Sequence, residues 1–221
     1  MTLHDLKNDF PYPDKPDYDI DLNVYPVWFR RCHADFFNRH IKKDAKLIVE
    51  LGTWIGSSTK WFCNNTDASV ICVDHWQGSA EHYKKFTQKQ LDELYDAFAL
   101  SNWDHRNQIT PVRMDSVSGM VKISEYGINN DVDVVYIDAS HNYEDVIVDL
   151  EMAYALFPNA IIIGDDFRWK NPTQDRRATV YEAVNHVADK RGLMIINHQR
   201  RGRFGWVWAV QGKNQNISSI F

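Results

Sequence analysis

Residues 46–56 read Lys-Leu-Ile-Val-Glu-Leu-Gly-Thr-Trp-Ile-Gly and decide the fold that the rest of the chain is expected to adopt. The run 46–51 is largely apolar and β-branched, which is typical of a parallel strand buried on both faces. Gly52 then allows a sharp turn in which a ligand can approach the backbone closely, and Gly56 opens a helix. Backbone N–H groups at the start of a helix favour a carboxylate or a phosphate. The stretch therefore predicts a strand, a glycine turn and a helix that together bind a polar ligand.

The remainder of the chain repeats this alternation of strands and helices. Helical patterns separate several apolar runs, as at 146–157 and 180–188. Only about seven residues separate the last two runs, too few for a helical crossover, so these runs are expected to pair as an antiparallel hairpin. The sequence predicts an α/β fold: a Rossmann-like, doubly wound, seven-stranded sheet, mostly parallel with an antiparallel last strand, and with helices on both faces. The strand candidates are 46–51, 69–74, 109–114, 132–137, 159–164, 193–197 and 205–210.

Composition narrows the class of protein. The chain has 221 residues, of which 44% are hydrophobic and 25% charged, an ordinary mix for one α/β domain. The net charge of −5 argues against nucleic acid as a partner, and the only basic patch is at 200–203. The three cysteines show no paired or metal-binding spacing. Without a signal-peptide pattern or a run long enough to span a bilayer, we expect a cytoplasmic protein with no membrane partner.

Two segments fall outside the regular alternation. Residues 10–26 contain four prolines and four aspartates and are expected to be extended. Trp28, Cys32 and Phe36 then recur at helical spacing. We therefore expect an N-terminal extension with a docking helix over 1–45 and the main domain over 46–221. Residues 77–108 exceed what a crossover requires, and they form either a crossover helix with an extension or a lid over the active site.

Polar residues follow the second and third predicted strands. Asp74 ends the second strand, 22 residues after Gly52, where a carboxylate can accept the two hydroxyls of a ribose or simply cap a turn. His75 and Trp76 come next, and the indole of Trp76 could lie against an adenine. Asp115 and Ser116 end the third strand and suit the exocyclic amine of adenine, although Ser116 could equally be a helix N-cap.

Carboxylates also end the fourth and fifth predicted strands. Asp138, Asp165 and Asp166 should therefore emerge at one edge of the sheet. Clustered carboxylates repel one another unless they are protonated or bridged by a cation such as Mg²⁺, whereas the alternative is that the last two only cap the next turn. His141 is the best candidate for a general base because imidazole titrates near neutrality.

These motifs resemble those of class I S-adenosylmethionine-dependent methyltransferases. The shared pattern is Glu-x-Gly-x-x-x-Gly after the first strand, an acid ending the second, Asp-Ser after the third and Tyr-Ile-Asp ending the fourth. The stretch 137–144 is more narrowly similar to an O-methyltransferase-like subgroup of the catechol and macrolide-sugar types, with the pattern Ile-Asp-Gly-x-His-x-Tyr. Ala139 stands where the subgroup has glycine, and Asp166 where catechol-type enzymes have Asn.

The resemblance implies that residues 46–221 form a class I methyltransferase domain that binds S-adenosylmethionine. It also implies O-methylation of a small-molecule or sugar hydroxyl. Asp138 and His141 would be catalytic, while Asp138, Asp165 and Asp166 would bind Mg²⁺ or another divalent cation. The acceptor's proton affinity would be lowered by His141 or by that cation. The expected cofactor-binding residues are Glu50, Gly52, Thr53, Trp54, Gly56, Ser57, Ser58, Asp74, His75, Trp76, Asp115, Ser116 and Asp138.

Two other functions are compatible with the sequence. The first is an NAD-dependent oxidoreductase, although its fingerprint is Gly-x-Gly-x-x-Gly whereas residues 52–56 read Gly-x-x-x-Gly. The second is a cofactor-binding module that serves as a partner or regulator without catalysis. The expected acceptor is a small molecule or a glycan. A nucleic-acid acceptor would depend on basic residues near 168–177 and 200–203, which the negative net charge does not favour.

Overall fold

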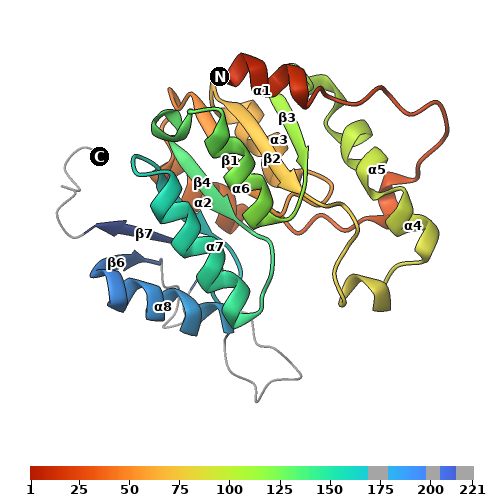
Figure 1. The fold of residues 1–221 in the computed structure, drawn as a ribbon. Helices are drawn as coiled ribbons and strands as arrows, with labels where there is room; N and C mark the ends of the chain where they lie inside the picture. Colours follow the sequence, from red (N-terminus) through yellow and green to blue (C-terminus); the bar gives the residue numbers. More distant parts are fainter. Residues whose placement is uncertain (169–178, 198–204, 213–221) are drawn as a thin grey trace.

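The structure is a computed structural model that describes residues 1–168, 179–197 and 205–212. Its centre is one seven-stranded sheet with the order β3-β2-β1-β4-β5-β7-β6 (Figure 1). The first five strands pair in parallel, and β7 is antiparallel to both β5 and β6. This confirms the predicted fold, including the terminal hairpin. The strands are β1 (Leu47–Leu51), β2 (Ser69–Asp74), β3 (Ile109–Arg113), β4 (Val134–Ile137), β5 (Ile161–Gly164), β6 (Leu193–Ile196) and β7 (Trp208–Gly212).

The strand order places a switch point beside β1. The chain leaves β1 to build β2 and β3 on one side, then returns to build β4 and β5 on the other. In sheets of this kind, the ligand site lies outside the carboxyl ends of the strands at such a switch point. The loops after β1 and β4 are therefore the place where the fold itself puts a binding site.

Helices cover both faces of the sheet, as predicted (Figure 1). Side chains alternate along β1, so Leu47, Val49 and Leu51 enter the core under α6, α7 and α8, whereas Ile48 enters the core under α2, α3 and α5. The long helices are α2 (Arg31–His40), α3 (Ser57–Asn65), α5 (Leu94–Ser101), α6 (Ser116–Glu125), α7 (Tyr143–Leu156) and α8 (Thr179–Arg191). The shorter ones are α1 (Leu3–Asp9), α4 (Gln88–Asp92) and four 3₁₀ turns, η1 (Leu22–Val24), η2 (His82–Lys84), η3 (Trp103–His105) and η4 (Asn129–Asp131).

The seventh strand begins later than the sequence predicts, at Trp208 instead of residue 205. The side chain of Asn197 explains the delay. Its amide nitrogen donates to the carbonyls of Gly205 and Val207, at 3.2 and 2.7 Å, and its Oδ1 accepts the N–H of Gly205 at 2.8 Å. A side chain thus replaces the first backbone bonds of the hairpin.

Among the described residues, no helix is long and apolar enough to cross a membrane.

The N-terminal residues pack on the sheet domain instead of standing apart from it. Helix α1, which the sequence did not predict, is capped by Thr2 and buries Leu6 completely in the core beneath α6. The docking helix is present as α2, although Trp28 precedes it. The segment between these helices is mostly irregular, and it is attached to the region of α4 and α5 by tyrosine hydroxyls, for example from Tyr25 to the carbonyl of Gln90 at 2.7 Å.

The segment 77–108 contains η2, α4, α5 and η3. Helix α5 buries Leu94, Ala97 and Phe98 in the core that contains Phe37 and Phe62. This apolar face accounts for a crossover helix packed on the sheet. That the same segment also acts as a lid stays a prediction.

We predict that Leu6→Ala will lower the free energy of unfolding by about 2–5 kcal/mol, because it leaves a cavity in a fully buried position. Chemical denaturation followed by circular dichroism measures the loss. Val27→Ala, at a residue that is 67% exposed in the same N-terminal segment, serves as the control and should change stability by less than about 0.5 kcal/mol. Equal stability of the Leu6 variant and the wild type would show that α1 is not part of the folded domain.

Candidate active site

The turn after β1 passes so close to the end of β4 that only glycine fits. Gly52 has φ +80°, and a Cβ atom there would lie 2.1 Å from the carbonyl oxygen of Asp138. Backbone bonds fix this approach, since the N–H of Gly52 donates to Val73 at 2.9 Å and the N–H of Asp138 donates to Leu51 at 2.8 Å. The predicted glycine turn and the predicted catalytic aspartate are therefore brought together by the backbone itself.

Glu50 lies beneath this turn and is completely buried. It accepts hydrogen bonds from the hydroxyls of Ser58 and Thr59, and the Thr59 bond is 2.5 Å long. Burial raises the pKa of Glu50 to about 7, since a desolvated carboxylate is unfavourable even with these bonds. Glu50 thus connects β1 to the first turn of α3, and it supports the predicted cofactor residues from below instead of lining the pocket.

The carboxylate of Asp74 holds the glycine turn from the side. It accepts the backbone N–H groups of Thr53 and Trp54 at 2.9 and 3.0 Å, and that of Trp76 at 2.7 Å. This is the turn-capping alternative considered from the sequence, now with its partners identified. Binding of ribose hydroxyls by the same carboxylate stays a prediction.

The predicted adenine neighbours differ in their surroundings. Trp76 is only 1% exposed and packs against Tyr95 and Phe98, with its indole N–H bound to the carbonyl of Trp54 at 2.9 Å. The packing does not favour contact between this ring and a cofactor. His75 accepts the N–H of Gln77 at 2.9 Å and is about half exposed.

The start of α6 supplies the other two predicted adenine residues. Asp115 is the N-cap, accepting the N–H of Ser118 at 2.9 Å, and this bond lowers the pKa of Asp115. Ser116 is therefore the first residue of the helix, so the suggestion that Ser116 is the N-cap is wrong. Both residues lie after β3, at the same edge of the sheet as the glycine turn.

A pocket opens next to the glycine turn and contains much of the predicted site. Among the predicted cofactor residues it brings together Thr53, Trp54, Ser57, Ser58 and Asp138. It does not include Glu50, Asp74, Trp76 or Asp115, which lie under or beside it. Five further described residues complete the lining, namely Trp28, Phe29, His33, Tyr136 and Asp165. Trp28 to His33 come from the N-terminal segment, for which the sequence predicted docking but no contact with the site.

Three residues that line this pocket carry buried polar atoms without a hydrogen-bond partner. These atoms are Thr53 Oγ1, Trp54 Nε1 and Asp165 Oδ1. Leaving such a group unsatisfied costs about 1–3 kcal/mol, so three such atoms around one pocket favour a polar ligand as their partner. The residues present therefore fit a small polar cofactor with a charged end at the start of α3.

Asp165 binds the N-terminal segment instead of joining the predicted metal triad. Its Oδ2 lies 2.7 Å from His33 Nε2, and both side chains are largely buried. Because His33 Nδ1 accepts the N–H of Arg30 at 2.8 Å, Nε2 carries the proton that it donates to Asp165. The two residues are 132 positions apart, so no spacing in the sequence could have indicated this pair.

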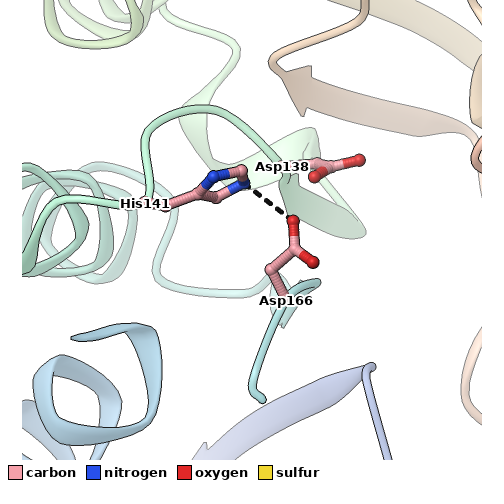
Figure 2. A group of neighbouring side chains, drawn as sticks. All are labelled: Asp138, His141 and Asp166. Carbon is pink, nitrogen blue, oxygen red and sulfur yellow. Dashed lines mark ion pairs between the residues drawn. The ribbon is translucent and has the colours of Figure 1, made fainter. Parts of the chain in front are cut away.

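His141 takes the place that Asp165 was predicted to have. Figure 2 shows His141 and Asp166 facing each other, with Nε2 and Oδ2 2.7 Å apart and Asp138 beside them. One donor atom from each of the three lies within 4.8 Å of the others. Two carboxylates and an imidazole could hold a divalent cation, and the nitrogen donor suits Mn²⁺ or another transition metal better than Mg²⁺.

The charges in this cluster also affect proton affinity. Burial raises the pKa of Asp138 well above its usual value, and the neighbouring charges of Asp165 and Asp166 raise it further. Burial lowers the pKa of His141, but the hydrogen bond and charge of Asp166 outweigh it, so the net pKa of His141 is raised. The surroundings therefore favour the protonated forms of both Asp138 and His141. His82 differs from His141, because its ring stacks on Trp54 and burial lowers its pKa to about 4.

We predict that Glu50→Gln will flatten the dependence of stability on pH. The pKa of Glu50 in the folded state, about 7, exceeds the ordinary value of 4.5 expected in the unfolded chain. The unfolded chain therefore binds fewer protons between these values, so this group makes the protein less stable as pH rises from about 4.5 to 7. The resulting loss in the free energy of unfolding is on the order of 3 kcal/mol. The variant should not show this loss, because glutamine does not titrate.

Urea unfolding at several pH values between 5 and 8 measures this effect. Glu144→Gln, at an exposed residue of α7, is the control and should reproduce the wild-type profile. A Glu50 variant whose stability falls with pH as steeply as the wild type would show that the carboxyl is ionised throughout.

Comparisons with known proteins agree with this geometry. A protein-family model described as a methyltransferase domain matches residues 49–167, which is more than half of the chain. The fold resembles a precorrin-6y C5,15-methyltransferase from Geobacter metallireducens GS-15, with 13% identity, a TM-score of 0.53, and coverage of 85% of this chain and 90% of that one. No curated protein matches the sequence.

Two further solved structures show how widely the fold is shared. A precorrin 8w decarboxylase from Methanobacterium thermoautotrophicum has 12% identity and a TM-score of 0.52, covering 87% of this chain and 95% of that one. An O-methyltransferase from Bacillus cereus in complex with SAH has 17% identity and a TM-score of 0.50, and the match covers 94% of this chain and 89% of that one. At such low identity these likenesses concern the fold and not the substrate.

Proposed function

The chain belongs to the methyltransferase-domain family, and from this premise we propose that it transfers a methyl group from S-adenosylmethionine to a hydroxyl oxygen of a small molecule or sugar. The observation that carries the proposal is the pocket in which the glycine-turn residues Thr53 and Trp54 meet Asp138. A methyl donor bound by the turn would present its reactive carbon to an acceptor beside that aspartate.

Different residues around the turn would bind different parts of the cofactor. The start of α3 at Ser57 and Ser58 would receive the methionine carboxylate, because unpaired N–H groups and the helix dipole favour an anion there. Asp138 and the ring of Trp54 would lie near the positive sulfonium, which carboxylates and aromatic faces stabilise. Asp74 would continue to hold the turn while its exposed edge meets the ribose.

The acceptor would be prepared by the cluster of Asp138, His141 and Asp166. Asp166 orients the imidazole through the 2.7 Å contact, so His141 can take the proton of an acceptor hydroxyl as the methyl group arrives. In the alternative route, a divalent cation bound by the three residues would lower the pKa of that hydroxyl, and His141 would serve as a ligand instead of as the base. The surrounding pocket would align the oxygen with the methyl carbon, and alignment of this kind supplies much of the rate.

The same observations bear on the two other functions that are compatible with the sequence, an NAD-dependent oxidoreductase and a non-catalytic cofactor-binding module. Family membership favours methyl transfer over hydride transfer to NAD. A non-catalytic cofactor-binding module would need the cofactor pocket but not the cluster at His141, so the variants below separate it from an enzyme.

We predict that S-adenosylhomocysteine, at about 100 times its Kd, will stabilise the protein by about 2.7 kcal/mol and raise its Tm by several degrees. Differential scanning fluorimetry measures the shift, with NAD at the same concentration as the control. A shift with NAD and none with S-adenosylhomocysteine would refute the proposed cofactor.

We predict that Asp138→Asn will reduce methyl transfer at least 100-fold, because Asp138 lines the pocket in which, under this proposal, the cofactor and the acceptor would meet. Transfer of tritiated methyl groups to a panel of phenols and methyl glycosides measures the rate, and calorimetry with S-adenosylhomocysteine checks that the cofactor still binds. Asp131→Asn, at an exposed residue of η4, is the matched control. Full activity in the Asp138 variant would contradict the assignment.

We predict that chelation with EDTA will slow the reaction and that Mn²⁺ will restore it better than Mg²⁺, because one of the three donor groups is an imidazole. His141→Ala should remove the response to Mn²⁺. If the rate is unchanged by EDTA but still falls in the His141 variant, His141 acts as a base without a metal.

A further inference from the structure

The pocket has a wall that the family match does not cover. The match spans residues 49–167, whereas Trp28, Phe29 and His33 lie before it and line the same pocket as Thr53 and Asp138. We call these three residues the N-terminal wall. The matched region supplies the glycine turn and the carboxylates at the strand ends. The N-terminal wall thus lies outside the matched residues and borders the same pocket as the glycine turn.

The N-terminal wall is held in place before any ligand binds. The segment that precedes it is attached by the hydroxyl of Tyr12 to the carbonyl of Ala99 at 2.8 Å and by Tyr25 to the carbonyl of Gln90 at 2.7 Å. On its other side, His33 binds Asp165 at 2.7 Å at the end of β5. A wall fixed at both ends contributes to selectivity because little conformational freedom is lost on binding.

The part of the N-terminal wall nearest the glycine turn is an aromatic stack. The ring centroid of Trp28 lies 5.2 Å from that of Trp54 and 5.6 Å from that of His82. The rings of Trp54 and His82 are stacked, with their centroids 4.3 Å apart. Trp28 is 41% exposed, so part of its ring surface is accessible. Burial lowers the pKa of His82 to about 4, so this ring is neutral at physiological pH and stacks as an uncharged aromatic.

The charges around the pocket limit what can stack there. Among the described residues that line it, the ionisable ones are Asp138, Asp165, His33 and Tyr136, and none is Lys or Arg. An acceptor with a carboxylate or phosphate would therefore meet the side chains of two aspartates in this lining and find no Lys or Arg to pair with. A planar apolar ring would find aromatic faces and a carboxylate edge that can accept a hydrogen bond.

We propose that Trp28 determines acceptor specificity by stacking on a planar ring that carries the methyl-accepting hydroxyl and no negative charge. The ring would lie on the exposed part of Trp28, with its hydroxyl directed toward Asp138. His33 is a positioning residue that holds Asp165 at the edge of the same pocket. This inference rests on the proposed methyl transfer and specifies its acceptor class.

The test measures binding of matched ring compounds to the full-length protein saturated with S-adenosylhomocysteine. The probes are the uncharged ester methyl 4-hydroxybenzoate, the corresponding free carboxylate 4-hydroxybenzoate, and the non-planar methyl 4-hydroxycyclohexanecarboxylate, each titrated by calorimetry. The wild type should bind the uncharged planar probe at least tenfold more tightly than either of the others. Trp28→Ala should weaken that binding at least tenfold, while the Kd for S-adenosylhomocysteine changes less than threefold.

Two further variants test whether weaker binding by Trp28→Ala results only from a loss of folding. Trp28→Phe keeps an aromatic face and should retain binding of the planar probe within about threefold of the wild type. Tyr154→Ala removes a ring of similar exposure, 37%, on α7 and should leave all three titrations unchanged. Melting curves confirm that each variant is folded.

Three results would overturn the inference while leaving the proposed cofactor intact. They are unchanged binding of the planar probe in Trp28→Ala, equal or tighter binding of the anionic probe, and no binding of any probe by wild-type protein that does bind S-adenosylhomocysteine. Failure of S-adenosylhomocysteine itself to bind the wild type would overturn the proposed function, and this inference with it.

Discussion

The close approach of Gly52 to the backbone at Asp138 is the constraint on which the rest of the site depends. A side chain at residue 52 would overlap the carbonyl of Asp138, so the absence of a Cβ lets two strand ends meet at backbone distance. The parallel pairing of β1 with β4 sets this distance, since Leu51 lies opposite Ile137. The fold thus brings the glycine turn and the end of β4 at Asp138 together through the backbone alone.

Buried carboxylates then shape the turn at a cost in stability. Glu50 is fixed below the turn by two hydroxyls, and Asp74 is fixed beside it by three backbone N–H groups. Within the described part of the chain, neither carboxylate has a Lys or Arg as a hydrogen-bond partner, so desolvation is offset mainly by hydrogen bonds from hydroxyls and backbone N–H groups. Such an arrangement keeps the turn rigid. A rigid turn is needed if the bound cofactor is to present one atom in one place.

Two layers of structure meet at the pocket. The sheet domain provides the turn and the strand-end carboxylates, and it is the part that matches the methyltransferase family. The N-terminal segment adds aromatic rings and His33, which binds Asp165 and so changes which residues can group around Asp138. Residues inside and outside the matched region therefore share one cavity.

The sequence by itself determined the fold and the place of the site. Strand and helix periodicities are local, and Gly52, Gly56 and the acids after the strands report directly on turns at the carboxyl edge of a parallel sheet. These features suffice for the sheet, the terminal hairpin and the grouping of Thr53, Trp54 and Asp138. Tertiary structure decided the partners of individual side chains. Trp76 is covered by Tyr95 and Phe98, Asp165 is bound by His33, and His141 joins Asp138 and Asp166, because each pairing depends on how segments distant in the chain dock together. The spacing of residues along the sequence does not predict how those distant segments dock.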